Sequence, residues 1–401
     1  MTARRTRHND PVRPPVSVLP APRRAARWPA ALALLLLCPP AGALGTPAPL
    51  PPGLTEAPAL ACQEAPDPAG GPRPFLSSVP ARPLPDGVTG RVAFYAAVYG
   101  PDGQPLRDVR LGDVDALHPL ASAFKSLVVR AALQEVDAGR LTLGTQLETT
   151  PGRRSIERYP AGRNTLEQLA RFALVRSDNT ASDILHLAAG PERVARAVAA
   201  LSACTHILHT TKALWAAQAG LLPDVFRPGT DAARYAALPL EERLPVAQAL
   251  NRRAQDLTGP QVETALDRYF HGQGYDPALE LALQNTSTAR AYAGLLARTL
   301  PGNDLKPTIR RLFRAWLADG CCKPAHPTLP ATFWGAKAGS GWRILTLTGA
   351  AELPGGQVLA YAYLNDQSGT LDAEDMERQI PAVVRWLDAT LTALAAGGPT
   401  P

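Results

Sequence analysis

Ser122 and Lys125 stand three residues apart at the start of a long apolar segment. At helical spacing, residues three apart lie on one face of the helix, so the hydroxyl and the amine are neighbours. Apolar residues follow at helical intervals, and Gly139 ends the run. The sequence therefore predicts that Ser122 lies in the first turn of a mostly buried helix.

That position suits a nucleophile. The free N–H groups and the dipole of a first helical turn favour negative charge nearby. If Lys125 is desolvated or lies close to another cation, it loses its proton and accepts the one on Ser122. The plainer interpretation is that Ser122 caps the helix and Lys125 is solvated. For an isolated Ser-x-x-Lys pair the plainer interpretation is the better one, so the interpretation of Ser122 as a nucleophile depends on the two motifs that follow.

Two later motifs carry further polar side chains. Ser-Asp-Asn at residues 177–179 lies between helix patterns at 165–174 and 181–189, where it is also an ordinary capping sequence. Lys-Ala-Gly-Ser-Gly at residues 337–341 ends a strand pattern, and its glycines allow close backbone approach. Each motif alone indicates no more than a helix cap or a strand end.

The charge of the chain is unevenly distributed. The 401 residues carry a net charge of +6, and 46% of them are hydrophobic, which is typical of a globular protein. Residues 1–43 hold seven arginines and one aspartate and account for the whole excess, so the remainder is neutral. The folded part therefore gives no electrostatic reason to expect a nucleic-acid partner.

The N-terminal segment has the features of an export signal. Basic residues precede an apolar run at 30–38, and Ala-Gly-Ala at 41–43 is a small-residue cleavage pattern. The run is too short to span a membrane as a mature helix. We predict a signal peptide over residues 1–43, an exported protein without a stable transmembrane segment, and a flexible linker over the Pro- and Ala-rich residues 44–90.

The order of the remaining patterns predicts the fold class. Strand patterns at 91–99 and 105–111 precede a long series of helix patterns, and three strands and a closing helix follow at 331–336, 342–351, 357–364 and 372–396. This order predicts an α/β (α+β) fold with an antiparallel five-stranded sheet flanked by helices. Both ends of the chain, residues 91–117 and 331–396, build the sheet, and an all-helical lobe at 118–320 is inserted between them. Clefts tend to form where such lobes meet.

The three motifs, in this order, resemble the set found in class A β-lactamases and penicillin-binding proteins. The similarity covers most of residues 91–396, including "EVDAGRLTL" after the first helix and "SDNTASDILHLAAGP" from Ser177. It is poor over about 205–284, which we interpret as a divergent insertion. The resemblance implies one serine hydrolase domain over residues 91–398, with no cofactor and no metal.

The resemblance also implies catalytic roles. Ser122 would attack a strained lactam or a peptide carbonyl to form an acyl-enzyme, with Lys125 as proton acceptor or relay. Backbone N–H groups of Ser122 and Ser340 would form the oxyanion hole, where losing one donor typically costs about a hundredfold or more in rate. Ser177 would pass a proton to the departing nitrogen.

Three further residues would bind the substrate or tune the site. Asn179 would hold both Lys125 and a substrate amide, and Gly339 would lie on the strand along which the substrate binds. Lys337 would attract the substrate carboxylate and help to keep Lys125 neutral by like-charge repulsion.

Ala338 is the first departure from the family pattern, because a hydroxyl residue usually stands there. Its absence removes a hydrogen bond to the substrate carboxylate worth roughly 1–3 kcal/mol. The Ser340 hydroxyl is the candidate to replace that bond.

The second departure concerns hydrolysis. Class A enzymes activate the deacylating water with a loop glutamate in the pattern Glu-x-x-Leu-Asn. Here Glu280 is followed by Leu283 and Asn285, with one residue too many. Glu280 is a possible deacylation base, and a solvated helix face is the alternative. Without such a base, acylation would proceed while hydrolysis stalls.

Four cysteines follow the predicted signal peptide, which allows two disulfides in an exported protein. Because a bond between the adjacent Cys321 and Cys322 is strained, we favour bonds that join these two residues to Cys62 and Cys204.

Three functions remain open. The chain is a hydrolase of β-lactam amide bonds, a D,D-peptidase or other penicillin-binding cell-wall enzyme with slow deacylation, or a non-catalytic relative that binds β-lactams or wall peptides. The partner is accordingly a small-molecule β-lactam or a cell-wall peptide. The presence of Ser122, Lys125, Ser177 and Lys337 argues against the non-catalytic alternative.

Overall fold

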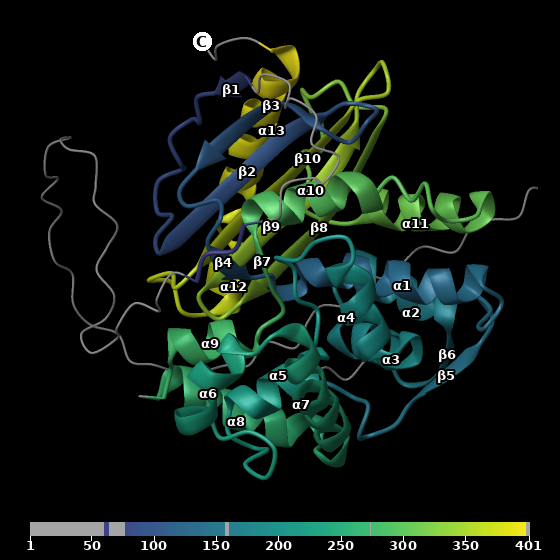
Figure 1. Cartoon of the computed structure of the whole chain (residues 1–401), viewed down its shortest axis with the longest axis vertical. Coiled ribbons are helices and arrows are strands. Elements are labelled where there is room, and N and C mark those ends of the chain that lie inside the picture. The colour runs from purple at the N-terminus through teal and green to yellow at the C-terminus, as the bar shows by residue number, and fades with distance from the viewer. Residues whose placement is uncertain (1–59, 64–76, 157–159, 273, 398–401) are drawn as a thin grey trace, which may run out of the picture. The chain divides into compact units, whose positions relative to one another are not determined.

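A computed structural model describes residues 60–63, 77–156, 160–272 and 274–397 (Figure 1). The predicted signal peptide, residues 1–43, and most of the predicted linker lie outside the described residues. Within these ranges no helix combines the length and the apolar character needed to cross a bilayer.

The strands are β1 (Ser77–Val79), β2 (Arg91–Tyr99), β3 (Pro105–Leu111), β4 (Leu117–Pro119), β5 (Gln146–Thr149), β6 (Gly162–Thr165), β7 (Thr286–Thr288), β8 (Phe333–Gly341), β9 (Ile344–Glu352) and β10 (Val358–Asp366). The α-helices are α1 (Lys125–Asp137), α2 (Leu166–Val175), α3 (Asn179–Ala189), α4 (Pro191–Ala199), α5 (Thr211–Gln218), α6 (Pro228–Ala237), α7 (Leu240–Arg253), α8 (Gly259–His271), α9 (Pro277–Leu283), α10 (Ala289–Thr299), α11 (Pro307–Asp319), α12 (Ala373–Glu377) and α13 (Ile380–Ala396). Two 3₁₀ helices are η1 (Ala121–Phe124) and η2 (Ala254–Asp256).

The main sheet has the order β1-β3-β2-β10-β9-β8. All neighbouring pairs from β3 to β8 are antiparallel, which confirms the predicted five-stranded sheet built from both ends of the chain. The sixth strand, β1, pairs with β3 in parallel and was not predicted. With only three residues in a Pro-rich region, β1 is too short to leave a strand pattern in the sequence.

Both faces of the sheet are covered, because successive side chains of a strand point to opposite sides. Tyr95 and Ala97 of β2 belong to the apolar cluster that includes α10, whereas Phe94 and Val98 belong to the cluster that includes α13. Figure 1 shows α10 and α13 on opposite sides of the sheet. The two-sided burial explains why β2 alternates only weakly between apolar and polar residues.

Helices α5 to α9 occupy the region that the sequence identified as a divergent insertion. They form an apolar cluster of their own, in which Phe226, Tyr235 and Phe270 are buried. The chain enters and leaves this lobe at one place, where His206 N donates to Thr286 O (2.8 Å) and Thr286 N donates to His206 O (3.1 Å). A pair of backbone hydrogen bonds therefore joins the two ends of the inserted lobe.

The predicted linker, residues 44–90, is described in two stretches, and both contact the domain. Leu117 N donates to Leu60 O (2.7 Å), and Trp386 Nε1 donates to Arg82 O (3.3 Å). Together with the pairing of β1, these bonds show that the folded part begins before residue 91, the boundary that the strand patterns predicted.

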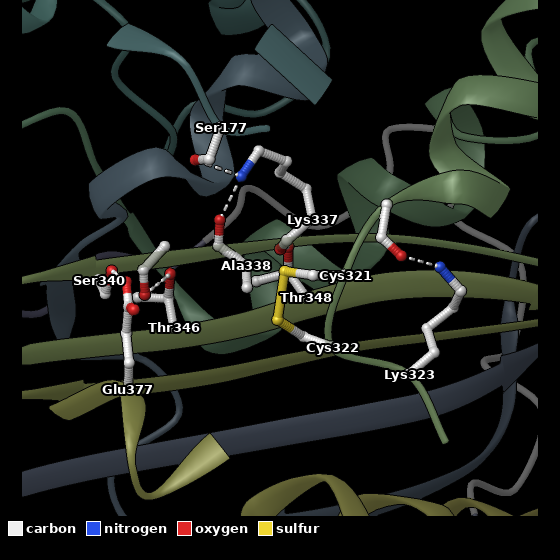
Figure 2. Close-up of a disulfide and its surroundings, with 12 residues drawn as sticks. Ser177, Cys321, Cys322, Lys323, Lys337, Ala338, Ser340, Thr346, Thr348 and Glu377 are labelled. Carbon is white, nitrogen blue, oxygen red and sulfur yellow. Dashed lines mark hydrogen bonds between the residues drawn. A yellow bond between two sulfur atoms is a disulfide. The ribbon is translucent and has the colours of Figure 1, made fainter. Parts of the chain in front are cut away.

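The disulfides join Cys62 to Cys204 and Cys321 to Cys322, so the predicted pairing is wrong. Strand β4 pairs with β7, and flanking bridges join Ala61 to Ala116 and His206 to Thr286. These contacts bring Cys62 and Cys204 to the same place. The adjacent cysteines remain beside β8 and bond to each other (Figure 2).

Buried charged side chains gather where the helical lobe meets the end of the sheet. Glu280 of α9 accepts a hydrogen bond from the Tyr275 hydroxyl (3.1 Å). Asp366, at the end of β10, accepts from Arg91 (2.6 Å) and lies 3.2 Å from His118 Nδ1. Burial raises the pKa of Glu280 to about 8, and the negative charge of Asp366 adds to the rise. Glu280 is therefore a carboxyl that the folded chain keeps protonated near neutral pH.

Glu280→Gln is expected to flatten the pH dependence of stability. Since the pKa of Glu280 rises from 4.5 to about 8 on folding, the native state keeps a proton that the unfolded chain releases. Stability therefore falls as pH rises through that window, by up to about 1.4 kcal/mol per pH unit. Because glutamine stays neutral in the folded and the unfolded state, the variant should not lose stability in this way as the pH rises. Urea unfolding at about pH 5 and about pH 8 measures the difference.

The matched control is Glu263→Gln, which changes an exposed glutamate on α8. It should keep the wild-type pH dependence. An identical fall in stability for wild type and Glu280→Gln would contradict the assignment of the proton to Glu280.

Candidate active site

Ser122 lies in η1, which packs against β8 and β9. The sequence predicted it in the first turn of the helix, and the structure places it in the 3₁₀ turn that leads directly into α1. The Thr346 hydroxyl of β9 donates to Leu120 O (3.0 Å) and holds the start of this turn. Ala121, the residue before Ser122, has φ +43°, a left-handed conformation that costs a non-glycine residue about 1–3 kcal/mol. The turn is thus held in an unfavourable backbone geometry by the strands beneath it.

Gly339 is the point where β8 touches this turn. A methyl group on Gly339 would come within 2.4 Å of Ser122 N and 2.8 Å of Ala121 Cβ. Only glycine allows such an approach without moving one of the two backbones. The structure therefore brings together the first and third predicted motifs, which are more than two hundred residues apart in the sequence.

Lys125 is fully buried at the start of α1. Its Nζ donates to Ser177 O (2.5 Å) and to Asn179 Oδ1 (2.6 Å), and it lies 3.5 Å from Ser177 Oγ. Asn179 is the first residue of α3, and Asp178 caps that helix by accepting from Ala181 N (2.7 Å). The Ser-Asp-Asn motif therefore caps a helix, as its plainer interpretation expected, and also contacts Lys125.

Lys337 reaches the same serine from the sheet. Its Nζ donates to Ser177 Oγ (2.8 Å) and to Ala338 O (2.5 Å), and Figure 2 shows the side chain extending from β8 to Ser177. Burial lowers the pKa of Lys337 well below its ordinary value, and the charge of Lys125 lowers it further. The Ser177 hydroxyl thus lies between two buried amines that repel each other when both are charged. Ser177 itself has φ +56°, a second strained residue at the site.

Ser340 does not offer a free hydroxyl in place of the one missing at Ala338. Its Oγ donates to Glu377 Oε1 of α12 (2.6 Å), as Figure 2 shows. Glu377 was missed by the sequence analysis because it belongs to an acidic run at 374–377 that is typical of a solvated helix face.

Glu280 has contacts with a different set of groups. The groups that set its pKa are Asp366, Tyr275, Gln218 and Arg343, none of which contacts either lysine amine through the interactions described above. The sequence places Glu280 close to the Thr286 helix cap, but α9 directs it towards the buried charges at the end of the sheet.

Asp183 is a buried carboxyl at the site that sequence reasoning missed. It lies one helical turn beyond Asn179 on α3, and its carboxylate accepts from Thr211 N (2.6 Å) and Lys212 N (2.9 Å) at the start of α5. Burial raises the pKa of Asp183 to about 7, while these two N–H groups and the charge of Lys125 oppose the rise. The i, i+4 spacing from Asn179 was the available signal. Asp183 therefore links the inserted lobe to the surroundings of Lys125.

A sequence model of the β-lactamase enzyme family matches residues 113–382. No curated protein matches the chain. Solved structures similar to it include a β-lactamase from Xanthomonas campestris (21% identity, TM-score 0.49, 76% of this chain and 93% of that chain). Others are β-lactamases from Sphaerobacter thermophilus (19%, 0.49, 77% and 93%) and Burkholderia vietnamiensis (20%, 0.47, 74% and 91%). The family match alone covers more than half of the chain, and the chain therefore belongs to the β-lactamase enzyme family.

Proposed function

We propose that the chain is an exported serine hydrolase that opens β-lactam amide bonds through an acyl-enzyme on Ser122. The observation that carries this proposal is the meeting of two buried lysine amines at the Ser177 hydroxyl, beside the turn that holds Ser122. Burying two amines of like charge is costly. It suits a site that must hold one amine neutral as a base.

The first step is attack by Ser122. Repulsion between two ammonium groups favours a state in which one of them is neutral. Neutral Lys125 accepts the proton of Ser122 as its oxygen bonds to the lactam carbonyl carbon. The negative charge that develops on the carbonyl oxygen is stabilised by the N–H groups of Ser122 and Ser340.

The second step protonates the departing nitrogen. Ser177 donates its hydroxyl proton to the nitrogen as the lactam C–N bond breaks, and the proton that Lys125 took from Ser122 replaces it, since Lys125 Nζ lies 3.5 Å from Ser177 Oγ. Lys337 holds the Ser177 hydroxyl in place through its 2.8 Å hydrogen bond. Asn179 keeps Lys125 in place through its side-chain oxygen. The ring opens and leaves an ester on Ser122.

Penicillin binding with slow deacylation is the second candidate function. The observation that favours it is the position of Glu280 in a different cluster of buried charges. Asp183, a buried carboxyl near Lys125, has both oxygens engaged by backbone N–H groups. Where neither of these two carboxyls activates water, the acyl group would persist, as it does in a penicillin-binding cell-wall enzyme.

Intact-mass measurement after addition of penicillin tests the proposal. We expect wild type to gain the mass of one penicillin, and Ser122→Ala to gain none. An adduct that disappears while penicillin is consumed indicates a hydrolase, and one that persists for hours indicates the second candidate. Ser126→Ala is the matched control, because Ser126 lies on α1 and bonds to Ala123 O rather than to the site. Equal behaviour of wild type and Ser122→Ala would refute the assignment of the nucleophile.

Gly339→Ala is expected to slow acylation by about a hundredfold, the loss typical when one oxyanion donor is displaced. The added methyl group would lie 2.4 Å from Ser122 N and force the turn and the strand apart. The rate of adduct formation measures the effect.

Gly341→Ala is the control on the same strand, since its methyl group would meet Ile344 only at 3.9 Å. It should acylate at nearly the wild-type rate. Wild-type acylation by Gly339→Ala would show that contact between β8 and Ser122 is not needed.

A further inference from the structure

The position of Glu377 is fixed by the fold. Met376, the residue before it, is fully buried in the apolar cluster that covers one face of the sheet. The segment that leads into α12 is tied to the start of β9, because Arg343 N donates to Leu371 O (2.9 Å). Helix α12 packs against β8 and β9. Glu377 therefore lies on an anchored element beside the catalytic strand.

The carboxylate of Glu377 faces the strand that carries Lys337. It accepts the hydrogen bond of the Ser340 hydroxyl at 2.6 Å, and Figure 2 shows Glu377 and Ser340 directed towards each other. Its negative charge also acts on Lys337, since it partly offsets the lowering of that amine's pKa. The neighbouring Arg378 pairs with Asp375. A carboxylate of the protein thus sits among the groups that would otherwise receive a carboxylate of the substrate.

Ala338 strengthens this interpretation. Its methyl side chain offers no hydrogen bond, so the Ser340 hydroxyl is the side-chain donor that this part of β8 provides. That hydroxyl is occupied by Glu377. An anionic ligand must displace Glu377 from Ser340 and approach a like charge, whereas an uncharged ligand group avoids the repulsion.

We propose that Glu377 is a specificity-determining residue that directs the site towards substrates that are uncharged or cationic beside Ser340 and against substrates that carry a carboxylate there. This inference rests on the proposed function of the same site and adds the charge class of its substrate. Because Glu377 is exposed, the discrimination should weaken as salt screens the repulsion.

The test compares benzylpenicillin, which carries a carboxylate, with its uncharged methyl ester. Glu377→Gln keeps the size of the side chain and an oxygen that accepts from Ser340, and removes the charge. We expect this variant to be acylated by the acid about tenfold faster than wild type and by the ester at the wild-type rate. The gain with the acid should shrink in about 1 M salt.

Glu374→Gln is the matched control, an exposed glutamate one turn earlier on α12. It should leave both rates unchanged. Equal effects of Glu377→Gln on the acid and the ester, or no effect on either, would overturn the proposal.

A failure of the proposed function gives a different result, in which neither compound acylates wild type or variant. Binding of the acid and the ester, measured by calorimetry on the same proteins, then decides the charge preference. Tighter binding of the acid alone by Glu377→Gln, again by about tenfold, would support the proposal. Unchanged binding of both compounds would refute it.

Discussion

Burial of two lysine amines around one serine hydroxyl is the constraint on which the rest of the site depends. A buried ammonium group needs hydrogen-bond acceptors, and a carboxylate would satisfy it most strongly. Lys125 donates to Ser177 O and Asn179 Oδ1, among its other interactions, whereas Lys337 donates to two uncharged oxygens, Ala338 O and Ser177 Oγ. An amine held by uncharged oxygens can give up its proton, whereas one held by a carboxylate keeps it. For Lys337 the lack of a carboxylate among these acceptors agrees with a pKa that burial holds well below the ordinary value of a lysine.

This arrangement explains why the sheet must be built from both ends of the chain. Lys337 comes from the edge strand β8, whereas Lys125 comes from α1 and Ser177 from the loop between α2 and α3, both of which lie between the two halves of the sheet sequence. Pairing of β2 with β10 closes the chain on itself and fixes where β8 can lie relative to α1. The strained backbone at Ala121 and Ser177 is tolerated because packing on both sides over-determines these positions.

Sequence reasoning succeeded where the signal is local and failed where it is not. The hairpin of β2 and β3 was predicted with its observed bounds, because a turn and two β-rich segments adjoin in the sequence. The predicted disulfide pairing was wrong because the observed pairing depends on isolated β-bridges between residues that are far apart in the sequence. Asp183 and Glu377 were missed for the same reason, since their partners on α5 and β8 come from other parts of the chain. Motif order predicted which three motifs the fold brings together, and only coordinates show which other charged groups surround them.

Under the proposed function, Ala338 and Glu377 act on the same part of the site and in the same direction. Alanine at position 338 removes a donor for a substrate carboxylate, and Glu377 occupies the donor that remains on Ser340. Either change alone would weaken carboxylate recognition, and Glu377 adds repulsion to the loss of a hydrogen bond. Under the proposed function Lys337 keeps a role whether or not a carboxylate binds, because its hydrogen bond holds the Ser177 hydroxyl that would protonate the departing nitrogen. The proposed acylation and the proposed recognition of substrate charge are therefore separable, the first depending on the two lysines and the second on Ser340 and its acidic neighbour Glu377.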